Sequence, residues 1–74
     1  MMVLWVQDCN NEDVAVVNVM TIEYTKGSKE FKIWDYNDNS AIITMKSDAD
    51  AERCVRNLYN SGKVQIEGDI NWEE

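Results

Sequence analysis

Runs of alternating apolar and polar residues occupy most of the chain and predict β-strands. Short polar segments separate these runs, and two of them, Lys26–Lys29 and Tyr36–Asn39, contain the Gly, Asn and Asp residues typical of tight turns. A longer polar turn is expected at Asp8–Glu12. The last three strands therefore form an antiparallel meander. The predicted strands are Val3–Gln7, Val14–Thr25, Glu30–Asp35 and Ser40–Met45.

One segment has helical periodicity instead. Ser47 is a good N-cap, Asp50 stands at the third helical position, and acidic residues in the first turn favour the positive end of the helix dipole. The segment 60–62 ends the helix, because Gly62 can adopt a left-handed conformation. A helix with one apolar stripe has to pack on another element, and the sheet is the only candidate. The predicted stripe contains Ala51, Cys54, Val55, Leu58 and Tyr59.

The segment from Lys63 to Trp72 alternates only weakly, with Val64 and Ile66 on one face. It fits either a fifth strand or an extension docked on the domain. The expected fold is therefore α+β, an antiparallel sheet of four to five strands with one helix packed on one face. The expected element order is either β-β-β-β-α or β-β-β-β-α-β. Residues 1–74 make a single domain.

The predicted second strand is apolar on both faces, with Val14 and Val16 on one side and Val17 and Val19 on the other. One helix cannot cover both faces of a sheet. A short open sheet would also leave unpaired strand edges, and such edges invite pairing with another chain. These features predict a homodimer or a higher homo-oligomer.

The chain is acidic, with 14 acids, 7 bases and a net charge of −7. This charge repels nucleic acid and anionic membranes and suits a partner protein with a basic surface. The apolar N-terminal run Met1–Val6 is too short for a membrane span or a signal peptide. The two cysteines suit a reducing compartment, with Cys54 buried and Cys9 a loop thiol; one disulfide is the alternative. We expect the cytoplasm of a bacterial host cell.

Most enzyme chemistry is missing from the sequence. There is no histidine, and the three glycines are too dispersed for a phosphate-binding loop. The segment Asp35–Asn39 matches the opening of a calcium loop, but Ser40 stands where glycine is needed and Lys46 where a bidentate glutamate is needed. The sequence therefore predicts no catalytic residue, no metal and no cofactor, and the protein is not expected to be an enzyme.

Trp34 shares its strand face with Lys32, opposite Phe31 and Ile33, so it points outward. It either contacts a partner or packs on the outer face of a neighbouring strand. Acidic residues beside exposed aromatic residues fit a protein-binding surface. The candidate protein-binding residues are Glu23, Trp34, Asp35, Tyr36, Asp38, Glu67 and Asp69.

The segments Trp5–Asp8, Val16–Val19 and Ala51–Val55 resemble a group of small, uncharacterised β-rich proteins of Gram-positive bacteria, phages and prophages. The resemblance implies an origin in a mobile element and carries over no site residue. The first hypothesis is a phage-type binding protein that inhibits a host defence factor. The alternatives are an oligomeric sponge that sequesters a signalling nucleotide, and a host protein-interaction module. A sponge would need cations for the phosphates, and the candidates are Lys29, Lys32, Arg53, Arg56 and Lys63.

Overall fold

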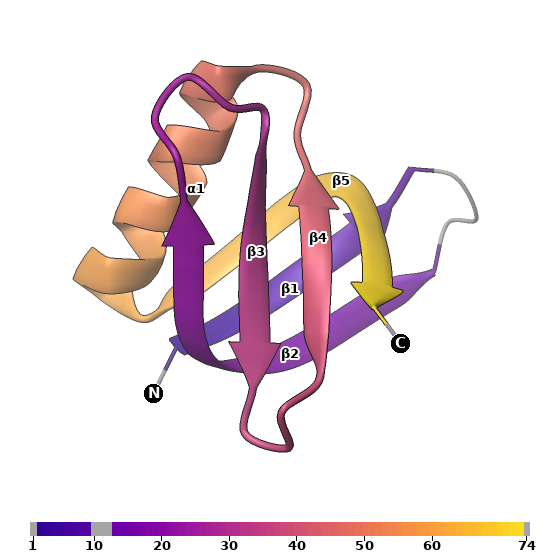
Figure 1. The fold of residues 1–74 in the computed structure, drawn as a ribbon. Coiled ribbons are helices and arrows are strands. Elements are labelled where there is room, and N and C mark those ends of the chain that lie inside the picture. Colours follow the sequence, from indigo (N-terminus) through magenta and orange to yellow (C-terminus); the bar gives the residue numbers. More distant parts are fainter. Residues whose placement is uncertain (1, 10–12, 74) are drawn as a thin grey trace.

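The computed structural model describes residues 2–9 and 13–73. It contains five strands and one helix in the order β-β-β-β-α-β (Figure 1). The predicted α+β fold is confirmed, and the C-terminal segment is a fifth strand. The elements are β1 (Met2–Asp8), β2 (Val14–Tyr24), β3 (Glu30–Asp35), β4 (Ser40–Thr44), α1 (Asp48–Ser61) and β5 (Lys63–Glu73).

The five strands close into a barrel in the order β1-β2-β3-β4-β5. Neighbouring strands are antiparallel except for β1 and β5, which are parallel and complete the circle. The expectation of an open sheet with unpaired edges is therefore wrong, because the first and last strands hydrogen-bond to each other. Closure gives each strand a hydrogen-bonded neighbour on both sides, although Val14–Asn18 of β2 pair only with β1.

The last strand closes the barrel by changing partners along its length. Its first half pairs with β1 from Lys63 to Gly68, and its second half pairs with β4 from Asp69 to Glu73. Figure 1 shows β5 rising beside β1, bending, and descending beside β4. The bend at Gly68 lets a single strand bridge two sides of the barrel.

The alternation along β2 reverses once. Val17 and Val19 are buried, whereas further along the strand Ile22 and Tyr24 are the inward, half-buried residues. The pairing with β3 shifts between Val19 and Thr21, so Met20 is an extra residue at a β-bulge. The bulge turns β2 from one side of the barrel to the other.

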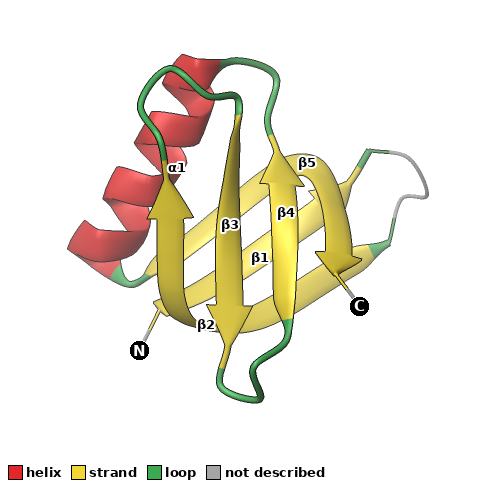
Figure 2. Ribbon diagram, in the orientation of Figure 1, coloured by secondary structure: helices red, strands yellow, loops and turns green. Residues whose placement is uncertain are grey.

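The helix packs against the side of the barrel, where it contacts β1, β2, β3 and β5 (Figure 2). Ser47 caps it by accepting a hydrogen bond from the Asp50 N–H at 3.2 Å. Gly62 ends it with φ 75° and a hydrogen bond from its N–H to the Leu58 carbonyl at 3.0 Å. The Gly62 carbonyl then accepts from the Val3 N–H at 2.8 Å, which starts β5 directly beside β1.

One apolar core joins the helix to all five strands. The predicted helical stripe is correct for Ala51, Cys54 and Leu58, which are buried, and for Val55, which is partly buried. It is wrong for Tyr59, which is 61% exposed at the end of the stripe. The fully buried side chains of largest volume are Phe31, Leu4, Ile33, Ile43, Leu58, Val6 and Val19.

The two cysteines are free, with Cys9 exposed and Cys54 buried, as the preferred interpretation predicted. Burial raises the pKa of the Cys54 thiol to about 12, so this side chain behaves as a small apolar core residue. Asp8, the first residue of the predicted turn at 8–12, is instead the last residue of β1, and residues 10–12 lie outside the described part of the chain.

Candidate protein-binding surface

The turn between β3 and β4 is organised by one carboxylate. Asp35 ends β3 and accepts hydrogen bonds from the backbone N–H groups of Asn37 at 2.8 Å and Asn39 at 2.9 Å. The Asn39 side-chain amide donates a third bond at 3.2 Å, and the Asp35 N–H donates to the Asn39 carbonyl at 2.9 Å. Asp38 lies at the tip with φ 64°, a left-handed conformation that Asp tolerates. The segment is therefore a hydrogen-bonded turn, as predicted from its Asn and Asp residues.

These bonds also decide the charge state of Asp35. Partial desolvation acts to raise the pKa of this carboxyl, but the hydrogen bonds from Asn37 and Asn39 favour the ionised form and hold the pKa below its usual value of 3.8. Asp35 is thus an anion that fixes the turn. Its carboxylate already accepts hydrogen bonds from the backbone, so we infer that Asp35 supports the shape of the surface by holding the turn in place.

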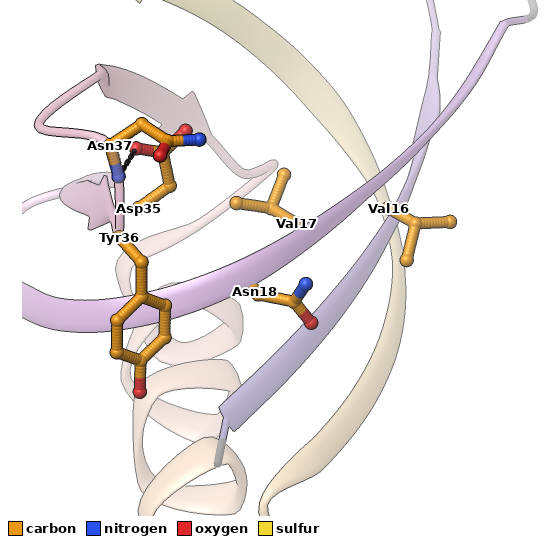
Figure 3. A pocket seen from close by; sticks show the side chains of 6 residues that line it. All are labelled: Val16, Val17, Asn18, Asp35, Tyr36 and Asn37. Atoms are coloured by element: carbon orange, nitrogen blue, oxygen red, sulfur yellow. Dashed lines mark hydrogen bonds between the residues drawn. The ribbon is translucent and has the colours of Figure 1, made fainter.

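Five of the seven predicted binding residues gather around this turn and the adjoining part of β2. Glu23, Trp34 and Asp38 line one surface hollow together with Met20, Thr21 and Ile22. Asp35 and Tyr36 line the neighbouring hollow with Asn37 and residues 16–18 of β2. Figure 3 shows this second hollow, with the Asp35–Asn37 hydrogen bond drawn and Val16 and Val17 on opposite sides of β2.

Trp34 points outward, as predicted, and lies beside neighbouring strands on the outer side of the barrel. It is half-buried, and it pairs with Thr21 of β2 and Ser40 of β4 on the outer side of the barrel. The Lys32 ammonium lies 4.9 Å from the centre of its ring and 3.0 Å from a Glu73 carboxylate oxygen. A contact of this kind adds about 0.5–1 kcal/mol at an exposed site, enough to orient the ring without covering it.

We name the surface formed by Met20, Glu23, Trp34, Tyr36 and Asp38 the Trp34 surface. Tyr36 is 58% exposed and Met20 43% exposed, so both apolar and acidic groups face solvent there. This combination suits a partner that offers Lys or Arg beside an apolar group, because aromatic side chains with acidic neighbours bind such residues through stacking and charge.

Glu67 and Asp69 do not join the Trp34 surface. Both lie on β5, on either side of the Gly68 bend, where they pair with Gln7 of β1 and Thr44 of β4 respectively. Glu67 and Asp69 are close in the sequence, but the bend at Gly68 turns them onto different parts of the barrel. They are therefore separate from the other five candidates.

The cations that a nucleotide sponge would need are dispersed and partly neutralised. Arg53 contacts Asp50 at 3.2 Å, Arg56 contacts Glu52 at 3.4 Å, and Lys32 contacts Glu73 at 3.0 Å. No observation in the described residues brings these cations together around one phosphate-sized site.

The second apolar face predicted at Val14 and Val16 is present on the outer side of β1 and β2, and the sequence analysis missed only that Trp5 belongs to it. Trp5 is 42% exposed, and Val14 and Val16 are 58% and 53% exposed. A signal for this surface was present, because Leu4 and Val6 flank Trp5 and an alternating strand that buries them has to turn Trp5 outward.

Two further properties bear on the class of site. Among residues 2–9 and 13–73, no group of three or more Cys, Asp or Glu side chains is placed to hold a metal ion. The helix in the described chain is too short and too polar to cross a membrane. The features assembled here are those of a small closed-barrel α+β domain with exposed aromatic and acidic side chains. Comparisons with protein families, with curated proteins and with solved structures return no match.

Proposed function

We propose that this domain is a non-enzymatic binding protein that docks its Trp34 surface on a basic surface of a partner protein. The observation that carries the proposal is that Glu23, Trp34 and Asp38, from two strands and a turn, line one hollow beside the exposed Met20. The net charge of −7 adds long-range attraction to a basic partner and repulsion from nucleic acid.

We further propose that the partner is a bacterial host factor, with a defence protein as the first candidate, and that binding inhibits it. The resemblance to small phage and prophage proteins supports this choice of partner. An acidic domain can inhibit a nucleic-acid-binding protein simply by occupying the basic groove that the nucleic acid uses. Inhibition then takes place in the cytoplasm of the host cell. Self-association of the domain forms part of the same proposal.

The test uses charge-neutralising variants that respect the local backbone. Glu23→Gln/Asp38→Asn removes two charges from the Trp34 surface, and Asn tolerates the left-handed conformation at position 38. Asp48→Asn/Glu52→Gln removes the same charge from α1, outside the hollow around Trp34, and serves as the matched control. Trp34→Ala removes the central ring, and circular dichroism establishes that each variant is folded.

The readout is phage plating on a panel of bacterial strains, each carrying one defence system and expressing the wild-type chain or a variant. We expect the wild-type chain and the control to restore plating on at least one strain. Trp34→Ala and Glu23→Gln/Asp38→Asn should lose most of that effect. Restoration on no strain would refute inhibition of a defence factor. Equal restoration by all variants would refute the Trp34 surface as the binding site.

A binding experiment with the purified domain tests separately whether it binds a basic partner. Titration of the isotope-labelled domain with a Lys/Arg-rich peptide should shift the Trp34 indole N–H signal and the Glu23 and Asp38 amide signals in NMR spectra. Raising the salt concentration should weaken these shifts, because the attraction is between exposed charges. Shifts centred on Glu67 and Asp69 instead would place the basic-partner site on β5.

A further inference from the structure

The outer side of β1 and its two neighbours carries few charges, and Trp5, Lys63 and Gln65 line a shallow hollow on it. Three residues from each strand point outward and stand in register, with Trp5 at the centre, Val16 beside it on β2 and Gln65 beside it on β5. We name this set the Trp5 surface: Val3, Trp5 and Gln7 of β1; Val14, Val16 and Asn18 of β2; and Lys63, Gln65 and Glu67 of β5.

The two charges on the Trp5 surface have opposite signs and stand at opposite ends of one strand. Lys63 is level with Val3 and Glu67 is level with Gln7, so Trp5 lies midway between the two rows. Everything else on the surface is neutral, in a chain of which 28% of residues are charged. A surface with these properties is self-complementary under one particular rotation.

We propose that the Trp5 surface is a homodimer interface whose two-fold axis runs across the strands, through Trp5, in the plane of the surface. This rotation places Trp5 of one copy on the partner's Trp5 and β5 on the partner's β5 with reversed direction. Lys63 of each copy then faces Glu67 of the partner, which gives two equivalent ion pairs along β5, at one edge of the apolar centre.

The alternative two-fold axis, parallel to the strands, is disfavoured by the same residues. It would stack β5 on the partner's β2 and place Lys63 on the partner's Asn18 and Glu67 on the partner's Val14. Both charges would lose water without gaining an opposite charge, which costs free energy. Charge complementarity therefore selects the first arrangement.

The size of the Trp5 surface sets the expected strength of the dimer. Three strands about 4.8 Å apart and five residues at about 3.3 Å each give an area of about 10 by 13 Å between outer Cβ atoms. This is well below the roughly 800 Å² per partner of a standard stable interface. The dimer should therefore be weak, and experiments have to reach millimolar protein.

The experiment is sedimentation equilibrium of the full chain from 10 µM to 2 mM at about 0.15 M salt. The wild type should show a monomer–dimer equilibrium. Lys63→Glu and Glu67→Lys should each raise the dissociation constant at least tenfold, because each change places like charges opposite one another. Lys29→Glu, in the exposed turn between β2 and β3, makes the same charge change as Lys63→Glu elsewhere and should leave the constant within threefold.

Two combinations make the test specific to the proposed symmetry. The double variant Lys63→Glu/Glu67→Lys should dimerise like the wild type, because both ion pairs are reversed together. An equimolar mixture of the Lys63→Glu chain and the Glu67→Lys chain should also form dimers, since every facing pair is again opposite in sign. A wild type that stays monomeric at 2 mM would overturn the proposal. So would dimers that neither single variant weakens, or a double variant and mixture that both stay monomeric.

Discussion

Gly68 stands where β5 leaves β1 for β4, and replacing it tests how the barrel closes. Position 68 pairs with Asp8, whereas the next residue, Asp69, pairs with Thr44. A Cβ atom at position 68 would lie 2.9 Å from the Thr44 carbonyl oxygen and 3.2 Å from the Met45 sulfur. The methionine side chain can rotate away, but the Thr44 oxygen belongs to backbone that pairs with β5. Gly68→Ala should therefore push β4 and β5 apart at the bend.

The expected loss is the cost of placing one methyl group in a filled space, about 1–3 kcal/mol of unfolding free energy. A chain of 74 residues has a total stability of about 4–11 kcal/mol, so the loss is a large fraction of it. For a domain of this size each kcal/mol lowers the melting temperature by about 4–8 °C. Urea unfolding followed by tryptophan fluorescence measures the free energy, and thermal unfolding followed by circular dichroism measures the melting temperature.

Gly27 provides the control, because a side chain at position 27 would strain the backbone without crowding any neighbouring atom. Its φ is +91°, and a Cβ atom would have no neighbour within 4 Å. Gly27→Ala should lower the stability because alanine is strained at a positive φ. Gly27→Asn should recover most of that loss because Asn tolerates positive φ. Gly68 has no such positive φ, so Gly68→Asn should be at least as damaging as Gly68→Ala. A Gly68→Ala stability within about 0.5 kcal/mol of the wild type would refute the close-approach argument.

Three further predictions address single side chains. Asp35→Asn should lower the melting temperature at pH 7, and the difference should vanish as the pH falls below 3.8, because the folded protein holds the Asp35 pKa below that value and stabilisation is lost when the carboxylate is protonated. Iodoacetamide at pH 8 should label only Cys9 in the native protein and both cysteines in urea, as counted by mass spectrometry, because burial raises the pKa of Cys54 to about 12. Leu58→Ala should cost about 2–5 kcal/mol in urea unfolding, whereas Tyr59→Ala should change stability by less than about 0.5 kcal/mol, and equal losses would contradict the assigned helix orientation.

Local features of the fold were predictable from local residues. Ser47 and Gly62 mark the helix ends in the sequence because capping depends only on neighbouring backbone groups. The turns at 26–29 and 36–39 were likewise readable from Gly and from Asn and Asp side chains. Tyr59 was misplaced because the sequence gives the stripe of a helix but not where the covering sheet ends, and at position 59 there is nothing left to pack against.

Barrel closure depends on contacts between distant segments and leaves little trace in the sequence. The parallel pairing of β1 with β5 joins residues about sixty positions apart, and it requires β5 to bend at Gly68. The bulge at Met20 also hides the true pattern, because the inward positions of β2 change from odd to even numbers at that point. A run of alternating residues that spans a bulge looks apolar on both faces. Part of the expected second apolar face was nevertheless correct, since Val14 and Val16 are exposed opposite buried Val17 and Val19.

The closed barrel changes what the acidic composition implies. Because closure gives each described strand two hydrogen-bonded neighbours, we expect recognition to use mainly outer side chains, and these differ around the barrel. On one side lie Glu23, Trp34 and Asp38, where negative charge stands next to an aromatic ring. Along β2 this part of the barrel adjoins the nearly uncharged surface around Trp5, because Val16 and Asn18 share a hollow with Tyr36. A chain with a net charge of −7 can approach a second copy of itself at low electrostatic cost only where its acids are absent or paired. A dimer through Trp5 therefore reaches the Tyr36 edge of the Trp34 surface, while Glu23, Trp34 and Asp38 line the next hollow and stay open to a basic partner.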